Sequence, residues 1–459
     1  MLRTCSLIAI LSLAVPGLAN AQFSFAPPVS LATGLNPSQV AAADWTGDDY
    51  LDLIVVNRAS DDANVFAGDG AGGFTLIDTF AVGNFPQGVI AADLDGLGGL
   101  DLVTTSVPFN TGNVSAWLGN GDGTFQTPAI GVTDDGPRSV QAVDFDGDLA
   151  LDLVTTNATR GNISVFLGDG DGTFGPEIRT PIGSGTAFPT DLAIADFDGD
   201  LLLDVITSNA QSADNSLGLV LGDGDGTFGP PTAIPTTCLR PESVVAGFFD
   251  ADANVDVAVA CFQSDEIAVL LGNGNGTFAA PVRYGIGPGA GDNPYWILAE
   301  DMDGDGELDL VTANNGSFSV YPGVGDGTFG TPTVVPSVSS FFGAVAADFD
   351  EDGRLDLALA DFGGDFLQVY LAEAPTPVPG LGFGGAGPGS RLRRRRDRRS
   401  PRRGLRRPSI RAPALVRPAR SGPTSRPPAS RRRASPPGPG AARREERTGS
   451  PRVPPRSIP

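Results

Sequence analysis

Short apolar runs separated by polar turns recur along most of the chain. In one stretch, residues 139–143, 151–156 and 162–167 form apolar or β-branched runs, and Gly, Asp and Asn fill the gaps between them. A fourth, Pro-rich run follows a turn that ends in Thr173 and Phe174. Runs of this length bounded by turn residues predict β-strands joined in hairpins. Because no stretch between the N-terminal leader and residue 375 keeps a helical period, we expect an all-β fold.

This group of four strands recurs about every fifty residues. An acidic segment follows the first strand of each unit, and the seven segments begin at Asp44, Asp93, Asp144, Asp196, Phe248, Asp301 and Asp348. The steps between these positions are 49, 51, 52, 52, 53 and 47 residues. A period near fifty with four antiparallel strands per unit is typical of propeller blades. The sequence therefore predicts a seven-bladed β-propeller over residues 22–373.

Two further markers keep the register of the repeat. A proline lies seven residues before the acidic segment in six units, where it suits the first residue of a strand: Pro37, Pro86, Pro137, Pro189, Pro241 and Pro294. The seventh unit has Phe341 at this position. A Gly-rich turn ends in a phenylalanine, which we expect to fill the core between blades: Phe74, Phe125, Phe174, Phe228, Phe278 and Phe329.

The last unit supplies only three strands, which end near Leu371. The segment around Phe25 resembles a fourth strand that lacks its own unit, because Phe25 precedes Asp44 by 19 residues, as Phe74 precedes Asp93. We therefore predict that the N-terminal strand completes the seventh blade and closes the ring, which would leave no apolar blade face exposed.

The acidic segments predict calcium sites, because calcium binds six to eight oxygen ligands and a tight loop can direct alternate carboxylates toward one ion. Positions 1, 3, 5 and 9 of the loop are all aspartate in four units. These full sets are Asp144, Asp146, Asp148 and Asp152; Asp196, Asp198, Asp200 and Asp204; Asp301, Asp303, Asp305 and Asp309; and Asp348, Asp350, Asp352 and Asp356.

The other three loops are incomplete. The first keeps Asp44, Asp48 and Asp52, with Thr46 at position 3, and the second keeps Asp93, Asp95 and Asp101, with Leu97 at position 5. We expect both to bind calcium more weakly. The fifth loop begins with Phe248 and keeps Asp250, Asp252 and Asp256, so we expect it to be empty. Leu149 and Leu201 replace the glycine that favours this turn at position 6. Solvated Asp-rich turns are the alternative for any single loop.

The D-x-D-x-D-x-x-x-D loops and the L-G-[DN]-G-[DN]-G-T-F turns at 118–125, 167–174, 221–228 and 271–278 resemble the FG-GAP and VCBS repeat family, which is related to the heads of integrin α-subunits. The resemblance covers about residues 23–372. It implies a seven-bladed propeller, calcium between the first two strands of a blade, and binding or adhesion more often than catalysis.

A ligand is expected on the face opposite the acidic loops. Arg58 and Arg160 lie in turns between second and third strands, and Tyr295 and Trp296 lie near the end of a long blade-to-blade connection. Aromatic side chains with a few polar groups suit sugars or peptides. Ordinary blade packing remains the alternative for Tyr295 and Trp296.

The first residues predict export. Arg3 precedes a short apolar stretch at 7–18, and Ala19-Asn20-Ala21 forms a cleavage site, so the signal peptide spans 1–21 and the mature chain begins at Gln22. The apolar stretch is too short to span a bilayer. We expect a bacterial protein that is secreted or held at the cell surface, with the periplasm as a further possible compartment. Cys238 and Cys261 are the two cysteines that remain after cleavage, and in an exported protein we favour a disulfide over two free thiols.

The charge is divided unevenly between two parts of the chain. Residues 1–390 contain 8 Arg and 51 acids, a net charge of −43, whereas residues 391–459 contain 23 Arg and 3 acids, a net charge of +20. A body this acidic is an unsuitable partner for nucleic acid. A Pro/Gly linker at 374–390 leads to the Arg/Pro-rich part, which we expect to be disordered. This end is either a frameshifted reading or a basic tail that binds anionic polymers or the acidic body.

The sequence therefore predicts a monomeric, calcium-binding binding or adhesion module for an extracellular glycan or protein. Without His and Lys, the chain cannot form a Ser-His-Asp triad or a lysine Schiff base. The alternatives are a secreted polysaccharide lyase or hydrolase on the same scaffold, and a purely structural surface protein.

Overall fold

The computed structural model describes residues 23–107, 112–133, 136–183, 187–210, 215–287 and 291–374. These residues contain strands and turns and no helix. Among them, no helix is long and apolar enough to cross a membrane. The predicted signal peptide and Arg/Pro-rich tail lie outside the described residues, as does the predicted linker apart from Ala374.

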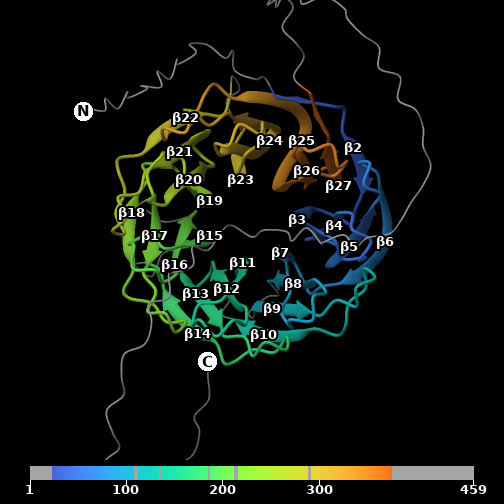
Figure 1. Ribbon diagram of the computed structural model, residues 1–459, viewed down its shortest axis with the longest axis horizontal. Coiled ribbons are helices and arrows are strands. Elements are labelled where there is room, and N and C mark those ends of the chain that lie inside the picture. The colour runs from blue at the N-terminus through green and yellow to red at the C-terminus, as the bar shows by residue number, and fades with distance from the viewer. Residues whose placement is uncertain are drawn as a thin grey trace, which may run out of the picture. The chain divides into compact units, whose positions relative to one another are not determined.

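Each of the first five repeats folds into a sheet of four antiparallel strands, and these sheets lie around a ring (Figure 1). The first repeat contains β3 (Pro37–Ala43), β4 (Asp52–Asn57), β5 (Asp62–Gly68) and β6 (Phe74–Ala81). The second contains β7 (Pro86–Ala92), β8 (Asp101–Ser106), β9 (Gly112–Trp117) and β10 (Ala129–Thr133). The third contains β11 (Pro137–Val143), β12 (Asp152–Asn157), β13 (Asn162–Phe166) and β14 (Ile178–Pro181). The fourth contains β15 (Pro189–Ala195), β16 (Asp204–Asn209), β17 (Ser216–Val220) and β18 (Thr232–Pro235). The fifth contains β19 (Pro241–Gly247), β20 (Asp256–Cys261), β21 (Glu266–Leu270) and β22 (Val282–Gly285).

The sixth and seventh repeats share one six-stranded sheet. It joins β23 (Pro294–Glu300), β24 (Asp309–Tyr321), β25 (Thr333–Ala347), β26 (Asp356–Asp361) and β27 (Phe366–Tyr370) to β2 (Val29–Ala32). Two long strands, β24 and β25, join the two repeats into one sheet. The first part of β25 pairs with β24 and its second part pairs with β26, so the fourth strand of one repeat runs into the first strand of the next. The all-β propeller is confirmed, but the prediction of seven separate blades is wrong, because the described residues form six sheets of four or more strands.

The N-terminal segment lies against the end of the last repeat. β2 pairs with β27 in the register Val29↔Val369 to Ala32↔Phe366, and β1 (Ser24–Phe25) pairs with β28 (Ala372–Glu373). Strand pairing does not join neighbouring sheets, so the predicted ring is not closed by a hydrogen-bonded ladder. The first and last repeats meet instead through side chains, with Leu53 and Phe66 in one apolar cluster with Leu367.

The burial of a strand depends on its place in the sheet. In six repeats the second strand is a separate strand that is buried at every position, because sheets cover both of its faces: β4, β8, β12, β16, β20 and β26. The fourth strands are more exposed, as in β18 with one buried residue of four. The first strand of each repeat faces the axis of the ring (Figure 1).

The register markers have structural roles. The six prolines begin β3, β7, β11, β15, β19 and β23, where a missing N–H costs no ladder bond. The turn phenylalanines pack against the second residue of a neighbouring acidic loop, as Phe228 does on Phe145 and Phe329 on Phe249, with ring centroids 5.5 Å apart in both pairs. Their predicted place between repeats is confirmed.

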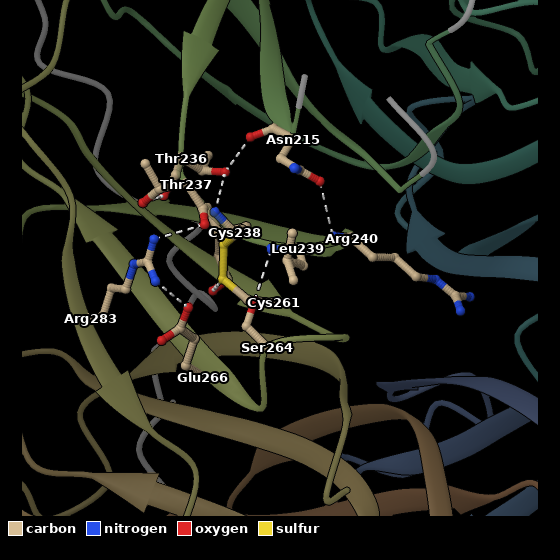
Figure 2. Close-up of a disulfide and its surroundings, with 11 residues drawn as sticks. Asn215, Thr236, Thr237, Cys238, Leu239, Arg240, Cys261, Ser264, Glu266 and Arg283 are labelled. Atoms are coloured by element: carbon tan, nitrogen blue, oxygen red, sulfur yellow. Dashed lines mark hydrogen bonds and ion pairs between the residues drawn. A yellow bond between two sulfur atoms is a disulfide. The ribbon is translucent and has the colours of Figure 1, made fainter. Parts of the chain in front are cut away.

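A disulfide joins Cys238 to Cys261, as we expected, and both residues are fully buried with Cα atoms 5.2 Å apart. Figure 2 shows that it connects the segment before β19 to the end of β20. Arg240 extends from the first segment, away from the disulfide (Figure 2), and Phe262 directly follows the second. The bond therefore fixes two chain segments that also meet where the Arg240 guanidinium lies over the Phe262 ring, 4.1 Å from its centroid.

Candidate functional site

The acidic loops bring three carboxylates together in five repeats. The groups contain positions 1, 3 and 9 of each loop, with one oxygen from each residue within 4.8 Å of the others: Asp93, Asp95 and Asp101; Asp144, Asp146 and Asp152; Asp196, Asp198 and Asp204; Asp301, Asp303 and Asp309; and Asp348, Asp350 and Asp356. Oxygens that share one calcium ion at about 2.3–2.6 Å must lie within roughly 5 Å of one another, so this spacing fits one ion.

The second loop supports this fit independently. Asp93 Oδ1 is buried and has no hydrogen-bond partner, which is costly for a carboxylate oxygen unless an ion binds it. We expected this loop to be weakened by Leu97 at position 5, but its three carboxylates meet as closely as those of the full loops. These residues could therefore hold a metal ion in five repeats.

The aspartates at position 5 do not join these groups in the described structure. Asp148, Asp200 and Asp305 instead accept a hydrogen bond from the backbone N–H two residues later, at 2.8, 2.8 and 2.9 Å. Asp352 does the same and also contacts the guanidinium of Arg354. Position 5 therefore shapes the turn, and its predicted role as a ligand stays a prediction.

The first and fifth loops do not form such a group among the described residues. In the first, Asp44 accepts hydrogen bonds from the amides of Gly47 and Asp49, and Asp48 accepts one from Tyr50. In the fifth, Asp252 accepts one from the amide of Asn254. Thr46 and Phe248 thus stand where the other loops supply a carboxylate.

Leu149 and Leu201 adopt the turn that glycine favours. Their φ angles are 79° and 73°, and the glycine at the same position in the sixth loop, Gly306, has 96°. Both leucines are exposed, at 91% and 83%. The loop therefore keeps its geometry in these repeats at the cost of local strain, which is typically about 1 kcal/mol for a residue of this kind.

The aspartate at position 9 has a structural role that the spacing did not reveal. It is at most 1% exposed in all seven repeats: Asp52, Asp101, Asp152, Asp204, Asp256, Asp309 and Asp356. One oxygen accepts a hydrogen bond from the amide of loop position 2, as Asp256 does from Phe249 at 2.8 Å. The other accepts one from the first amide of the Gly-rich turn, as from Gly272 at 2.8 Å. The carboxylate thus joins the loop after strand one to the turn after strand three.

The glycine in this pair is required by a close approach of the backbone. A Cβ on Gly272 would lie 2.1 Å from the carbonyl oxygen of Val255, and one on Gly119 would lie 2.2 Å from that of Leu100. In the seventh repeat the chain ends of the propeller replace the turn. There the amide of Ala372 donates to Asp356 at 2.7 Å, and Phe25 pairs with Ala372.

Burial raises the pKa of every position-9 carboxyl, and the backbone hydrogen bonds oppose this effect. The rise is largest for Asp309, whose pKa is about 7, and for Asp204, whose pKa is about 6. Neighbouring carboxylates add to it, Asp303 and Asp305 in one case and Asp198 and Asp200 in the other. A cation at these loops would relieve the repulsion.

A cavity of about 500 Å³ lies on the axis of the propeller and is lined by the first strands of the repeats. The residue directly after the register proline, or after Phe341 in the seventh repeat, lines it in every repeat, and we call this set the mouth ring: Ser38, Gln87, Arg138, Thr190, Glu242, Tyr295 and Phe342. These residues lie at the start of each first strand, and the acidic loops follow its end. The mouth ring therefore lies at the opposite end of the cavity from the acidic loops.

Three of the four predicted ligand-face residues line this cavity: Arg58, Tyr295 and Trp296. Trp296 also packs against the apolar cluster of the last two repeats, so its packing role is present too. Arg160 does not line the cavity. The reason is its position, since Arg58 is the first residue after its second strand and Arg160 is the third after β12.

Sequence reasoning missed the charged and aromatic partners of these residues. Arg240 Nε lies 3.0 Å from Glu242, and Arg138 lies 3.7 Å from the other oxygen of that carboxylate. Tyr295 stacks on Phe342 at 4.0 Å and meets Phe262 edge-on at 4.5 Å. The signal that could have found the mouth ring is the position directly after the register proline or Phe341, because the residue there lines the cavity in all seven repeats.

The fold and the carboxylate loops define a β-propeller of loop-bearing repeats that surround an axial cavity. A sequence model of the FG-GAP-like repeat matches four segments, at residues 93–155, 150–207, 249–312 and 301–359. The chain therefore belongs to the FG-GAP-like repeat family, as its sequence suggested. No curated protein sequence matches the chain significantly.

Solved structures with similar folds have low sequence identity. The BP39L lectin of Burkholderia pseudomallei aligns with a TM-score of 0.54 and 18% identity, covering 74% of this chain and 99% of the lectin. A catalytically inactive virginiamycin B lyase of Staphylococcus aureus, solved with quinupristin, gives 0.52 and 12%, with coverage of 76% and 99%. BBS1N, solved in complex with ARL6DN, gives 0.53 and 13%, with coverage of 75% and 98%. At these identities the likeness shows the propeller fold alone.

The structural role of position 9 can be separated from metal binding in the fifth repeat. We expect Asp256→Ala to lower the free energy of unfolding by about 2–4 kcal/mol, because two buried amides lose their acceptor. Asp252→Ala in the same exposed loop is the control, with an expected loss below about 1 kcal/mol. Denaturant unfolding in EDTA measures both. Equal losses for the two variants would contradict the structural role.

Proposed function

We propose that the chain is an exported, calcium-stabilised β-propeller that binds a glycan at its axial cavity. The observation that carries this proposal is the mouth ring, which collects charged and aromatic side chains around a cavity of about 500 Å³. Ligand sites for small molecules typically have volumes of about 300–1,000 Å³ and combine apolar walls with a few polar groups.

The aromatic side chains favour a sugar as ligand. Tyr295 and Trp296 lie on β23, and Phe342 lies on β25 in the next repeat. All three line the cavity and are half-buried, so each keeps surface that a ligand can contact. Polar neighbours such as Gln87 and Ser38 can donate and accept hydrogen bonds from hydroxyl groups. The similar fold of a lectin is consistent with this proposal, although it does not carry it.

Two features of the cavity favour binding over catalysis. Glu242 is engaged by two guanidiniums, and Asp191 accepts hydrogen bonds from Ser243 Oγ at 2.7 Å and from the amide of Val244 at 3.2 Å. Carboxyl groups held in this way are poorly placed to transfer protons to a substrate. The third carboxyl group of the lining, Glu300, lies at the end of β23 beside the acidic loops, away from the mouth ring.

Calcium is the cation that we propose for the acidic loops of the second, third, fourth, sixth and seventh repeats. All their candidate ligands are carboxylate oxygens, which suit a hard cation. Because position 9 also accepts hydrogen bonds from two amides, an ion there would stabilise the loop and the adjacent turn together.

Calcium removal should destabilise the protein strongly at pH 8 and weakly at pH 5.5. The raised pKa values of Asp309 and Asp204, about 7 and 6, mean that their ionised forms disfavour the empty folded state above those values. As pH falls through them the folded state takes up protons, so this penalty disappears and protons displace calcium. We expect EDTA to lower Tm on the order of 10 °C at pH 8. Calorimetry at both pH values tests this: no shift at pH 8 would exclude the role of calcium, and equal shifts at the two pH values would exclude the role of the raised pKa values.

Binding at the cavity is tested by Tyr295→Ala, with Tyr50→Ala near the acidic loops as the matched control. We expect Tyr295→Ala to weaken capture of an oligosaccharide at least about 10-fold, because a stacked aromatic contact is lost. A glycan array identifies the oligosaccharide and calorimetry measures its affinity. If both variants bind like the wild type, the axial cavity is not the site.

Export is tested by the mass of the mature protein. We expect expression of the full sequence in a bacterium to give an exported chain that begins at Gln22, because cleavage follows Ala21. Mass spectrometry of the medium, periplasm and cytoplasm identifies the N-terminus and compartment. Retention of an uncleaved chain in the cytoplasm would contradict export.

A further inference from the structure

Two guanidiniums line the mouth of the cavity, those of Arg58 and Arg138, and Arg240 pairs with Glu242 from beside it. The lining carboxyl groups are Asp191 and Glu242, and Glu300 at the end of β23, near the acidic loops. Glu242 pairs with Arg138 and Arg240. Arg58 makes no ion pair with any residue in the described part of the chain. Arg58 is therefore the guanidinium at the mouth without a carboxylate partner among the described residues.

The guanidiniums are close enough to affect one another. Burial lowers the pKa of Arg138, and the positive charges of Arg58 and Arg240 act in the same direction while Glu242 opposes them. Burial also lowers the pKa of Arg58. An anion placed beside Arg58 would relieve this repulsion in a partly dehydrated site, where a charge-assisted hydrogen bond is strong.

The aromatic residues reinforce this preference for an anion. Phe342 is stacked between Tyr295 at 4.0 Å and Phe362 at 4.1 Å, both at 21° between planes. Because both of its faces are covered, Phe342 can meet the cavity that it lines only with its edge. The edge is the positive end of the ring quadrupole and attracts oxygen atoms that carry negative charge.

Backbone contacts place this aromatic row beside Arg58. Asn36 Nδ2 donates to the carbonyl oxygen of Phe362 at 2.8 Å, and the amide of Arg58 donates to the carbonyl oxygen of Asn36 at 2.9 Å. Phe362 is the first residue after β26, as Arg58 is the first after β4. The row of rings from Phe262 to Phe362 therefore ends next to the unpaired guanidinium.

We infer that the mouth ring selects an acidic sugar, a hexuronate, whose carboxylate pairs with Arg58 and whose ring lies along the aromatic row. This inference rests on the proposed glycan binding and specifies its ligand class. Because residues 1–390 carry a net charge of −43, a long polyanion would be repelled by the rest of the body. A single hexuronate at the end of an oligosaccharide meets positive charge only at the mouth.

Calorimetry on the calcium-loaded full chain tests this with methyl glucuronide, methyl glucoside and acetate as probes. We expect the glucuronide to bind, and Arg58→Gln to weaken it roughly 10- to 100-fold while Arg58→Lys retains part of the affinity. Arg179→Gln is the matched control, because Arg179 lies on the outer strand β14 and already pairs with Glu177 at 2.6 Å. Unchanged melting temperatures show that each variant is folded.

The other outcomes separate this inference from the proposed function. Equal binding of glucoside and glucuronide, unaffected by Arg58→Gln, overturns the selection of an anion and leaves glycan binding intact. Acetate that binds as tightly as the glucuronide overturns the role of the sugar ring. Failure of both sugars to bind overturns the inference, and the oligosaccharide array then decides whether glycan binding itself survives.

Discussion

In every repeat a buried carboxylate at the start of the second strand accepts hydrogen bonds from two separate pieces of backbone, and much of the propeller depends on this contact. It connects the loop after strand one to the turn after strand three, so it fixes both ends of a hairpin that would otherwise be held only by its ladder. In six repeats the turn residue whose amide donates lies so close to a backbone carbonyl oxygen that only glycine fits there. The same carboxylate then contributes to a possible metal group in five repeats. One residue therefore both holds the backbone together and belongs to the group that could hold an ion.

This double use explains why the acidic pattern persists where a metal group does not form. Asp256 and Asp52 keep both backbone contacts although the fifth loop begins with Phe248 and the first has Thr46 at position 3. Spacing alone could not distinguish the two roles, because a carboxylate that accepts amides and one that binds an ion occupy the same alternating positions. The same holds for position 5, whose side chains accept hydrogen bonds from amides of their own turn, so its predicted role as a ligand stays a prediction.

The sequence was most informative where a residue has one physical purpose. Proline marks the start of a first strand, and the positions of the turn phenylalanines follow from packing against the neighbouring loop. The count of separate sheets failed because the step from Asp301 to Asp348 is the shortest, at 47 residues, and no break separates the strand that begins at Thr333 from the next first strand. At the cavity, Arg58 and Tyr295 were found from their positions. Arg138 was missed because its partner Glu242 comes from a distant repeat, and Phe342 because its stack with Tyr295 forms only when two repeats pack together. Pairing across the axis cannot be read from a local pattern.

The pairing of β2 with β27 joins residues 29–32 to residues 366–369, so it spans nearly the whole described chain. Contacts of such large sequence separation form late, because the entropy of closing the intervening chain must be overcome first. A ribosome or a translocation channel that delivers the chain from its N-terminus would release the first repeats long before their partner strand exists. The last sheet consequently remains incomplete, with an unpaired edge, until synthesis or transport has passed residue 370. The acidic loops of the earlier repeats contact only their own and the next repeat, as Phe145 packs on Phe228 and the amide of Gly276 donates to the carbonyl oxygen of Phe197, so they can reach their final form during that interval.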